Sequence, residues 1–419
     1  MEETINNNDK KTQEKTKRNY RPRTNKTSKV NKEGEKIKRT NKKNKEKNQT
    51  EQFKFKKSKL KIIPLGGLLE IGKNITVFEY ENDIVLVDCG LAFPEDDMLG
   101  IDLVIPDLTY LEKNKEKIRG LVITHGHEDH IGSIPYLLKQ FNVPIYGTKL
   151  TIGLIEHKLE EHKLLKSAKL KVVTPGQTVS LGSMRVEFIR ITHSIPDACS
   201  LAIHTPVGTV VHTGDFKIDY TPIDGEMIDF GRLAELGNKG VLALMSDSTN
   251  SERKGYTMSE STVGEVLDKL FINCTKRIVV ATFSSNVHRI QQIVNSAVKY
   301  GRKVAICGRS MVNTIETARK FGYIKVPDNV FIDIDMIKSY PDEKLTIITT
   351  GSQGETMSAL TRMASGEHKK VQITPNDLII ISANPIPGNE NSVSKVIDDL
   401  MKIGAEVIYN ALEDIHVSG

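Results

Sequence analysis

Cysteine is scarce in this sequence, and the few copies present are far apart. The 419 residues contain four cysteines and no C-x-x-C pair. Their positions are Cys89, Cys199, Cys274 and Cys307. This scarcity argues against a disulfide framework and against a cysteine-ligated zinc site, and it fits a protein of the reducing cytoplasm.

Long apolar runs are also missing. No stretch approaches the roughly 18 apolar residues of a membrane span, and the N-terminal segment lacks the apolar core of a secretory signal. The composition, 38% hydrophobic and 27% charged, is ordinary for a globular protein. The length allows two domains and a tail, and we expect a cytoplasmic protein without membrane contacts.

The formal charge of +6 conceals an uneven distribution along the chain. Residues 1–58 carry 20 lysines and arginines against 8 acidic residues, a net of about +12, so the remainder carries about −6. The same segment is nearly free of apolar residues and cannot bury enough surface to offset the entropy of ordering the chain. We therefore expect a disordered basic tail, which serves either as an electrostatic arm for RNA or another polyanion, or for solubility.

Metal-ligating residue types are concentrated in residues 124–130, which read T-H-G-H-E-D-H. An apolar run that predicts a short buried strand precedes them. Side chains alternate along extended chain, so His125 and His127 can point to the same side, while Asp129 and His130 begin the next helix. Imidazole and carboxylate suit zinc or manganese, and two ions about 3.5–4 Å apart can activate a water and hold a phosphoryl group. The stretch predicts a two-metal site rather than a histidine-rich surface turn.

Two further ligand types follow strand-like segments later in the chain. His193 comes after the alternating apolar run 188–191, and Asp215 comes after the strand-like run 209–211. The order H-x-H-x-D-H, then a separated His, then a separated Asp resembles the metallo-β-lactamase superfamily. This resemblance implies an α/β fold, an αββα sandwich, which we expect to span residues 59–257.

Other polar residues near these strands have weaker interpretations. Asp88 follows a strand-like run and either orients a ligand histidine or caps a turn. His212 lies inside a strand pattern, and we expect it to pack or to support a ligand rather than to bind metal. His157 and His162 are five apart on a charged helical stretch, and we expect both at the surface.

From about residue 258 the sequence alternates helical and strand-like segments. The strand-like runs are apolar throughout, which is typical of a parallel sheet covered on both faces. They are residues 277–282, 303–307, 345–349 and 378–382. We expect a second α/β domain over residues 258–405, inserted into the first, with residues 406–419 beginning the return to the first domain.

Several short motifs extend the resemblance over residues 60–419. They are 64–74 (P-L-G-G-L-L-E-I-G-K-N), 246–250 (S-D-S-T-N), 283–289 (F-S-S-N-V-H-R), 350–355 (T-G-S-Q-G-E), 383–390 (A-N-P-I-P-G-N-E) and 416–419 (H-V-S-G). These motifs are similar to those of the β-CASP group of nucleases and, within it, of the bacterial ribonuclease J family. The family pattern continues past the last residue here, so we expect the remaining strands, one more metal ligand and a catalytic histidine to be absent.

The resemblance implies two zinc ions per subunit, with manganese or magnesium as alternatives in activity. One ion would be bound by His125, His127 and His193. The second would be bound by Asp129, His130 and Asp215, with Asp215 bridging the two ions. Asp247 matches a motif that supports the metal site from the second domain, and the candidate catalytic set is Asp129, Asp215 and Asp247.

The resemblance also implies a pocket for the terminal phosphate of RNA. One half would be formed by Ser284, Ser285 and Asn286. The other half would be formed by His416, Val417, Ser418 and Gly419. Without the resemblance, the alternative for residues 284–286 is the N-cap of a helix predicted over 286–300.

The function implied is that of a zinc-dependent ribonuclease with 5′–3′ exonuclease and endonuclease activity, acting in mRNA decay and rRNA maturation. RNA would be the partner, with a homodimer or homotetramer and an RNA-degradation complex as assemblies. A small-molecule metallo-hydrolase on the same core is disfavoured by the large insertion and the phosphate motifs. A metal-free RNA-binding scaffold is disfavoured by the ligand set up to Asp215.

Overall fold

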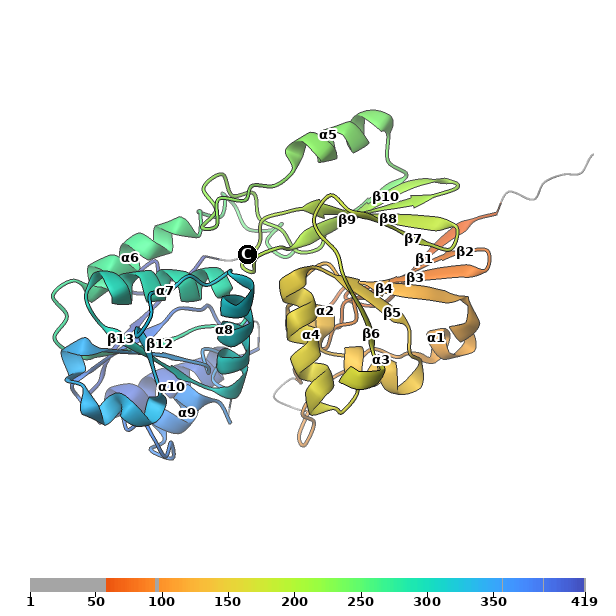
Figure 1. The fold of residues 1–419 in the computed structure, drawn as a ribbon. Coiled ribbons are helices and arrows are strands. Elements are labelled where there is room, and N and C mark those ends of the chain that lie inside the picture. Colours follow the sequence, from red (N-terminus) through yellow and green to blue (C-terminus); the bar gives the residue numbers. More distant parts are fainter. Residues whose placement is uncertain (1–57, 95–97, 356, 387, 418–419) are drawn as a thin grey trace, which may run out of the picture. The chain divides into compact units, whose positions relative to one another are not determined.

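The computed structural model describes residues 58–94, 98–355, 357–386 and 388–417. The predicted basic tail lies outside these ranges apart from its last residue. Figure 1 follows the described chain through its helices and strands. Within these ranges no helix is both long and apolar enough to cross a membrane.

The first domain begins with a six-stranded sheet in the order β1-β2-β3-β4-β5-β6. Its strands are β1 (Leu60–Gly66), β2 (Ile75–Tyr80), β3 (Asp83–Val87), β4 (Ile118–Val122), β5 (Pro144–Gly147) and β6 (Lys169–Val172). The helices between them are α1 (Thr109–Lys113), α2 (Glu128–Ile131), α3 (Ile134–Gln140) and α4 (Lys149–Glu161), with 3-10 turns at Lys115–Lys117 and Leu165–Ser167. The first three strands run antiparallel, and β3 to β6 run parallel.

A second sheet of five strands in the order β11-β10-β9-β8-β7 packs on the first. Its elements are β7 (Thr178–Leu181), β8 (Met184–Arg190), β9 (Cys199–Thr205), β10 (Gly208–His212), α5 (Phe230–Lys239) and β11 (Ala243–Met245). Phe78 and Val122 of the first sheet share a buried cluster with Phe188 and Leu201 of the second. Helices α1 to α4 pack on the other face of the first sheet, and α5 covers the second sheet through Leu236. The predicted αββα sandwich is confirmed.

The second domain is a parallel six-stranded sheet in the order β14-β13-β15-β12-β16-β17. Its strands are β12 (Arg277–Ala281), β13 (Lys303–Cys307), β14 (Phe331–Ile332), β15 (Leu345–Thr349), β16 (Asp377–Ile381) and β17 (Glu406–Tyr409). Its helices are α6 (Ser261–Phe271), α7 (Val287–Lys299), α8 (Arg309–Phe321), α9 (Ala359–Ala364) and α10 (Glu390–Ile403), with 3-10 turns at Ile334–Ser339 and Asp342–Lys344. Strand β17 extends this sheet four residues past the boundary expected at residue 405.

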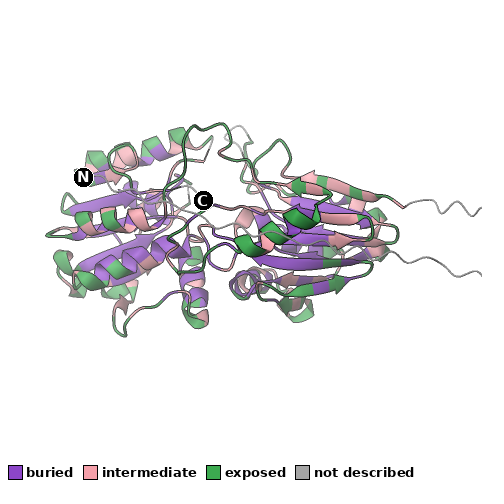
Figure 2. Cartoon of the chain, turned by 90° about the horizontal axis from the view of Figure 1, so that it is seen from above, coloured by how far each residue is buried: buried purple, intermediate pink, exposed green. Residues whose placement is uncertain are grey.

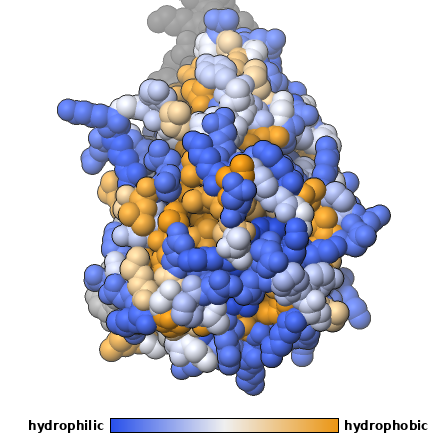
Figure 3. Space-filling model, turned by 90° about the vertical axis from the view of Figure 1, so that its left-hand side faces the viewer, coloured by the Kyte–Doolittle hydropathy of each residue, from blue (hydrophilic) through white to orange (hydrophobic). Residues whose placement is uncertain are grey.

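Both faces of the parallel sheet are covered, as its continuously apolar strands predict. In β12, Ile278 and Val280 contact the cluster of α6, α7 and α8, while Val279 contacts the cluster of α9 and α10. Figure 2 shows these strands buried between partly exposed helices. On the face drawn in Figure 3, hydrophilic side chains predominate and apolar side chains lie between them in small groups.

Helix α4 of the first domain contacts α8 of the second. A side chain at Gly153 would place its Cβ 2.6 Å from both Thr317 Cγ2 and Phe321 Cε2, so the close approach requires glycine. His157 Nε2 lies 2.8 Å from Thr317 Oγ1. His157 is therefore only partly exposed, because α8, which is distant in the sequence, covers one side of α4.

Glu79 of β2 forms a buried ionic cluster whose strength should depend on pH. The residue is only 3% exposed, and its carboxylate accepts hydrogen bonds from Lys61, Lys117 and Tyr110. Burial alone would raise the pKa of Glu79, but these three donors outweigh it and lower the pKa to about 2.

We expect the stability contributed by ionised Glu79 to be complete above pH 4.5 and to be lost as the pH falls towards 2. The gain should be on the order of 2 kcal/mol, because the partly exposed lysines are screened by solvent. Urea unfolding of Glu79→Gln should show this deficit at pH 7 and a smaller one at pH 3. The exposed substitution Glu316→Gln is the control, and an equal deficit of Glu79→Gln at both pH values would contradict the prediction.

Candidate metal centre

The chain remains extended after β4, which brings two histidines to the same side. His127 has φ −74° and ψ 154° and is the N-cap of α2. His125 is fully buried at the end of the strand. Gly126 between them has no room for a side chain, because its Cβ would lie 2.8 Å from Leu154 of α4. The packing of α4 on this turn thus fixes the direction of both imidazoles.

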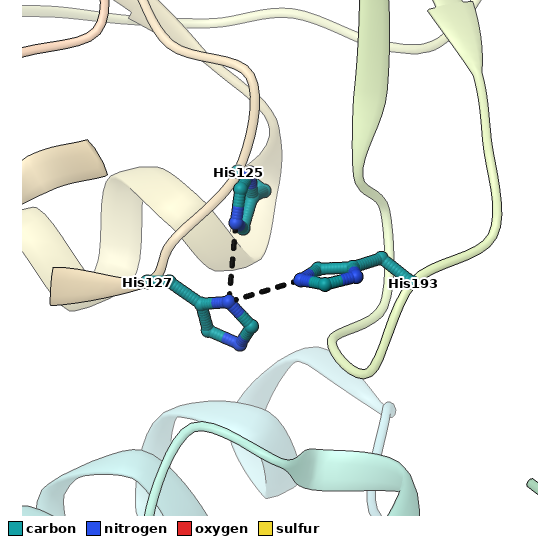
Figure 4. Close-up of side chains that lie close together, drawn as sticks. All are labelled: His125, His127 and His193. Atoms are coloured by element: carbon teal, nitrogen blue, oxygen red, sulfur yellow. Dashed lines mark hydrogen bonds between the residues drawn. The ribbon is translucent and has the colours of Figure 1, made fainter. Parts of the chain in front are cut away.

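Three histidine rings converge at this turn, as Figure 4 shows. His127 Nδ1 lies 3.1 Å from His125 Nε2 and 3.1 Å from His193 Nε2. Two nitrogens bound at 2.0–2.1 Å to one tetrahedral ion lie roughly 3.3–3.4 Å apart, so the spacing fits a shared metal ion. The first of the predicted ligand groups is therefore assembled in the structure.

A second donor group adjoins the first. His130 Nε2 lies 3.3 Å from Asp215 Oδ2 and 3.4 Å from Asp129 Oδ2. The ligand atoms of His125, His130 and Asp215 all lie within 4.8 Å of one another. His125 thus belongs to both groups, and the six predicted ligands form one continuous cluster.

Asp88 orients His130 from the opposite side of the ring. Its carboxylate lies 2.8 Å from His130 Nδ1 and accepts hydrogen bonds from the backbone N–H and the hydroxyl of Thr124. Asp88 is 1% exposed and adopts φ +59°. Because Nδ1 is occupied by Asp88, Nε2 is the nitrogen that faces the cluster. Of the two roles considered for Asp88, the contacts support orientation of a ligand histidine.

The electrostatics of the cluster favour a bound cation. Burial and the neighbouring imidazoles lower the pKa of His125 well below its usual range and that of His193 to about 3, so both rings present lone pairs. Burial would also lower the pKa of His130, but Asp215, Asp129 and Asp88 outweigh it and raise the pKa well above 6.5. The carboxylates thus create a negative potential beside His130, which a bound cation would neutralise. Neutral imidazoles beside carboxylates are the donor set of a divalent metal ion.

The turn that carries Asp215 is fixed by its neighbours. His212 Nδ1 accepts a hydrogen bond from the backbone N–H of Gly214, which has φ +60°. Lys217 N–H donates to the Thr192 carbonyl, and the Thr192 hydroxyl donates back to the Lys217 carbonyl. These contacts join the loop of His193 to the loop of Asp215, and His212 supports the site without being a ligand.

Asp247 is placed beside this turn rather than in the ligand cluster. Its backbone N–H donates to Thr213 Oγ1 at 2.9 Å. Among the described residues, its carboxylate accepts hydrogen bonds from the backbone N–H and the hydroxyl of Thr249. The candidate catalytic role of its carboxylate stays a prediction.

The candidate phosphate residues lie at the carboxyl edge of the parallel sheet, between β12 and α7. Ser284 and Ser285 are half-buried, whereas Asn286 is buried and caps α7, its Oδ1 accepting a hydrogen bond from Arg289 N–H at 3.0 Å. Of the second half, His416 is half-buried and Val417 is buried. Ser418 and Gly419 lie outside the described residues. The N-cap interpretation therefore holds for Asn286, and the phosphate role of this segment stays a prediction.

A cavity of about 220 Å³ adjoins the cluster of candidate metal ligands. His193 lines it from the first domain, together with Lys217, and His288 lines it from α7. The sequence reasoning missed Lys217, His288 and also Asn74, whose amide lies 3.3 Å from Asp129 Oδ2. Asn74 and His288 belong to motifs noted in the sequence, and Lys217 lies two positions after the predicted ligand Asp215, so proximity to these features was the available signal.

Comparison with known families agrees with this architecture. The model described as "Metallo-beta-lactamase superfamily" matches residues 70–237, and that described as "Ribonuclease J, beta-CASP domain" matches residues 275–400. The chain is therefore a metallo-β-lactamase superfamily protein that carries a β-CASP domain.

Similar proteins of known family identify the group within this class of metallo-β-lactamase proteins to which the chain belongs. The chain is 56% identical to ribonuclease J of Synechocystis sp. over 362 residues, 50% identical to ribonuclease J of Helicobacter pylori over 364, and 45% identical to ribonuclease J2 of Bacillus subtilis over 361. It belongs to the ribonuclease J family. The matches cover 86%, 87% and 86% of this chain but 57%, 53% and 65% of the relatives, so the chain spans little more than half the length of the first two.

A solved structure shares the fold. A crystal structure titled as a protein of unknown function from Enterococcus faecalis V583 superposes with a TM-score of 0.61, covering 86% of this chain and 88% of the other. The sequence identity is 16%, so the likeness concerns the fold alone.

Proposed function

We propose that this chain carries the catalytic centre of a metal-dependent ribonuclease that cleaves RNA from its 5′ end and internally. The main support is the convergence of histidine and carboxylate side chains from three separate loops. These residues are His125, His127, Asp129, His130, His193 and Asp215. Membership of the ribonuclease J family supports RNA as the substrate.

The six candidate ligands fall into two groups of three that lie close together in the structure. His125, His127 and His193 would hold one ion, and Asp129, His130 and Asp215 would hold the other. Two divalent ions, zinc with manganese or magnesium as alternatives, would activate the attacking water and stabilise charge on the phosphoryl group.

The two aspartates are the proposed proton acceptors. The side chains of Asp129 and Asp215 are 34% and 33% exposed, so their carboxylates are accessible to a water molecule. We assign them to orient the attacking water and to accept its proton on a carboxylate oxygen. Asp247 would act indirectly, since its backbone holds the turn that precedes Asp215.

The start of α7 is the proposed site for a 5′-monophosphate. The hydroxyls of Ser284 and Ser285 and the backbone N–H groups of a 13-residue helix offer donors to an anion, and His416 to Gly419 would close the pocket. The cavity is bordered by the ligand His193 and by His288 of α7, so a short strand of RNA would reach both positions. Anchoring the 5′ end there favours stepwise release of mononucleotides.

The remaining assignments follow from family membership. We propose that the enzyme acts in mRNA decay and rRNA maturation in the cytoplasm, as a homodimer or homotetramer and within an RNA-degradation complex. The four unpaired cysteines support a reducing compartment.

RNA with different 5′ ends tests the proposal. We expect the full-length protein to release mononucleotides from 5′-monophosphorylated RNA faster than from the same RNA with a 5′-triphosphate, and a chelator should abolish both reactions. Separating the products by size on a gel measures the outcome. Internal fragments whose amounts do not depend on the 5′ group would contradict the proposed phosphate pocket but support the nuclease activity. Absence of cleavage under all conditions would refute the proposed function.

A further inference from the structure

The guanidinium of Arg289 is fully buried where four segments meet. Its Nε and Nη2 donate to the two carboxylate oxygens of Glu260 at 2.6 and 3.0 Å. Its Nη1 donates to the Ser382 carbonyl at 3.1 Å and to the Ile415 carbonyl at 2.8 Å. The Ser382 hydroxyl also donates to the Ile415 carbonyl at 2.6 Å. One side chain thus connects the start of α6, the end of β16 and the segment after β17.

The same residue hydrogen-bonds Asn286 of one proposed half of the phosphate pocket and Ile415, which directly precedes the other half. The backbone N–H of Arg289 donates to Asn286 Oδ1, the cap of α7. Ile415 directly precedes His416, and burial together with the nearby Arg289 guanidinium lowers the pKa of His416 to about 3. Asn286 and the residue that leads into His416 are therefore both anchored on one arginine, although 130 positions separate Asn286 from His416 in the sequence.

The charge of Arg289 is already matched. Glu260 forms a forked ion pair with the guanidinium and also accepts a hydrogen bond from Gln292. Because Glu260 offsets much of its charge, this fully buried guanidinium contributes mainly geometry to a neighbouring phosphate. A lysine at this position would keep the charge. Its single nitrogen could not reproduce the planar arrangement of hydrogen bonds that Arg289 donates to Glu260 and to two carbonyls.

We propose that Arg289 is a positioning residue that assembles the two halves of the 5′-phosphate pocket and thereby sets the preference for 5′-monophosphorylated RNA. This inference rests on the proposed function and names the residue on which its 5′ selectivity depends. Arg289 itself touches neither the phosphate nor the reacting atoms.

Arg277 provides a matched control in the same sheet. It forms a forked pair with Asp377 at 2.6 and 2.8 Å and donates to the Gln372 carbonyl, and the two side chains are 11% and 1% exposed. This pair lies at the start of β12 and β16, whereas Arg289 acts at their carboxyl ends. Arg277→Lys therefore weakens a buried arginine–carboxylate pair without touching the proposed pocket.

The test measures binding without cleavage. The metal-free full chain, kept in chelator, is titrated with a short RNA that carries either a 5′-monophosphate or a 5′-hydroxyl, and the affinity ratio is compared among variants. We expect Arg289→Lys to reduce the ratio of the affinity for 5′-monophosphate RNA to the affinity for 5′-hydroxyl RNA at least about fivefold, mainly because the phosphorylated RNA binds more weakly. We expect Arg277→Lys to leave this ratio within twofold of the unmodified chain. Ser382→Ala removes a single hydroxyl from the cluster and should produce a smaller loss if Arg289→Lys does not fold.

Each outcome decides the inference. The inference would be overturned if Arg289→Lys and Ser382→Ala both left the affinity ratio unchanged. It would also be overturned if Arg277→Lys lowered the ratio as much as Arg289→Lys. If the unmodified chain binds both RNAs equally, both the proposed phosphate pocket and this inference are wrong. If the ratio depends on Arg289 but the metal-loaded chain cleaves no RNA, the positioning role stands and the proposed nuclease function fails.

Discussion

Replacement of His127 by alanine is expected to abolish RNA cleavage while leaving RNA binding within a few-fold of the unmodified chain. His127 Nδ1 is the atom that faces both His125 and His193, so its loss removes the centre of the first ligand group. Loss of a partner outside the ligand set typically costs 10–100-fold in metal affinity or activity, so loss of a direct ligand should exceed about 100-fold. The proposed phosphate pocket and the basic tail are untouched.

The measurement combines metal content, cleavage rate and RNA affinity. His127→Ala should hold less metal per chain after dialysis and should bind RNA normally in fluorescence anisotropy. His162→Ala is the matched control, because this ring lies edge-on to Tyr136 at the end of α4 and outside the cluster. Near-normal cleavage by His127→Ala would place the active site elsewhere.

Replacement of Asp88 by asparagine should destabilise the metal-free chain by roughly 3–5 kcal/mol, the usual cost of breaking one partner of a buried ion pair. Asp88 and His130 are each 2% exposed in their side chains and lie 2.8 Å apart. Asparagine keeps the size and tolerates the φ of +59°, but it turns one acceptor into a donor facing His130 Nδ1 or Thr124.

Urea unfolding in chelator measures this loss. Asp229→Asn is the control, because Asp229 is exposed and caps α5 by accepting from Arg232 N–H, a role that asparagine fills equally well. Metal affinity should also fall in Asp88→Asn, since the ring of His130 loses the contact that orients it. A change in stability no larger than that of the control would show that Asp88 serves only its own turn.

The sequence predicted the elements that carry the site because their signals are local. The apolar run before residue 124 and the ligand types directly after it lie in one short segment, and parallel strands present such segments at one sheet edge. Helix α7, predicted over residues 286–300, is observed over Val287–Lys299, so its predicted ends lie within one residue of the observed ones. The parallel second sheet followed from the same kind of local pattern, whereas the αββα core was implied by the resemblance to the metallo-β-lactamase superfamily.

What the sequence could not predict depends on contacts between distant segments. Asn74 meets Asp129 across 55 positions, and Arg289 meets Ile415 across 126, so neither contact leaves a local pattern. The edge strand β6 is mostly exposed and β14 has two residues, which is too little for a periodic signal. The contact of His157 with Thr317 could not be predicted either, since the two residues are 160 positions apart.

The strand order of the second sheet also bears on how the protein is synthesised. Strand β12 ends at residue 281 and lies between β15 and β16, which begin at residues 345 and 377. At a synthesis rate of about 5–20 residues per second, its neighbours emerge roughly 3 to 20 s later. During this interval the buried residues 278–281 have no sheet partner. Among the described strands, β12 thus waits longest for a sheet partner, so this part of the second domain is where a ribosome-bound chaperone would have the most to protect.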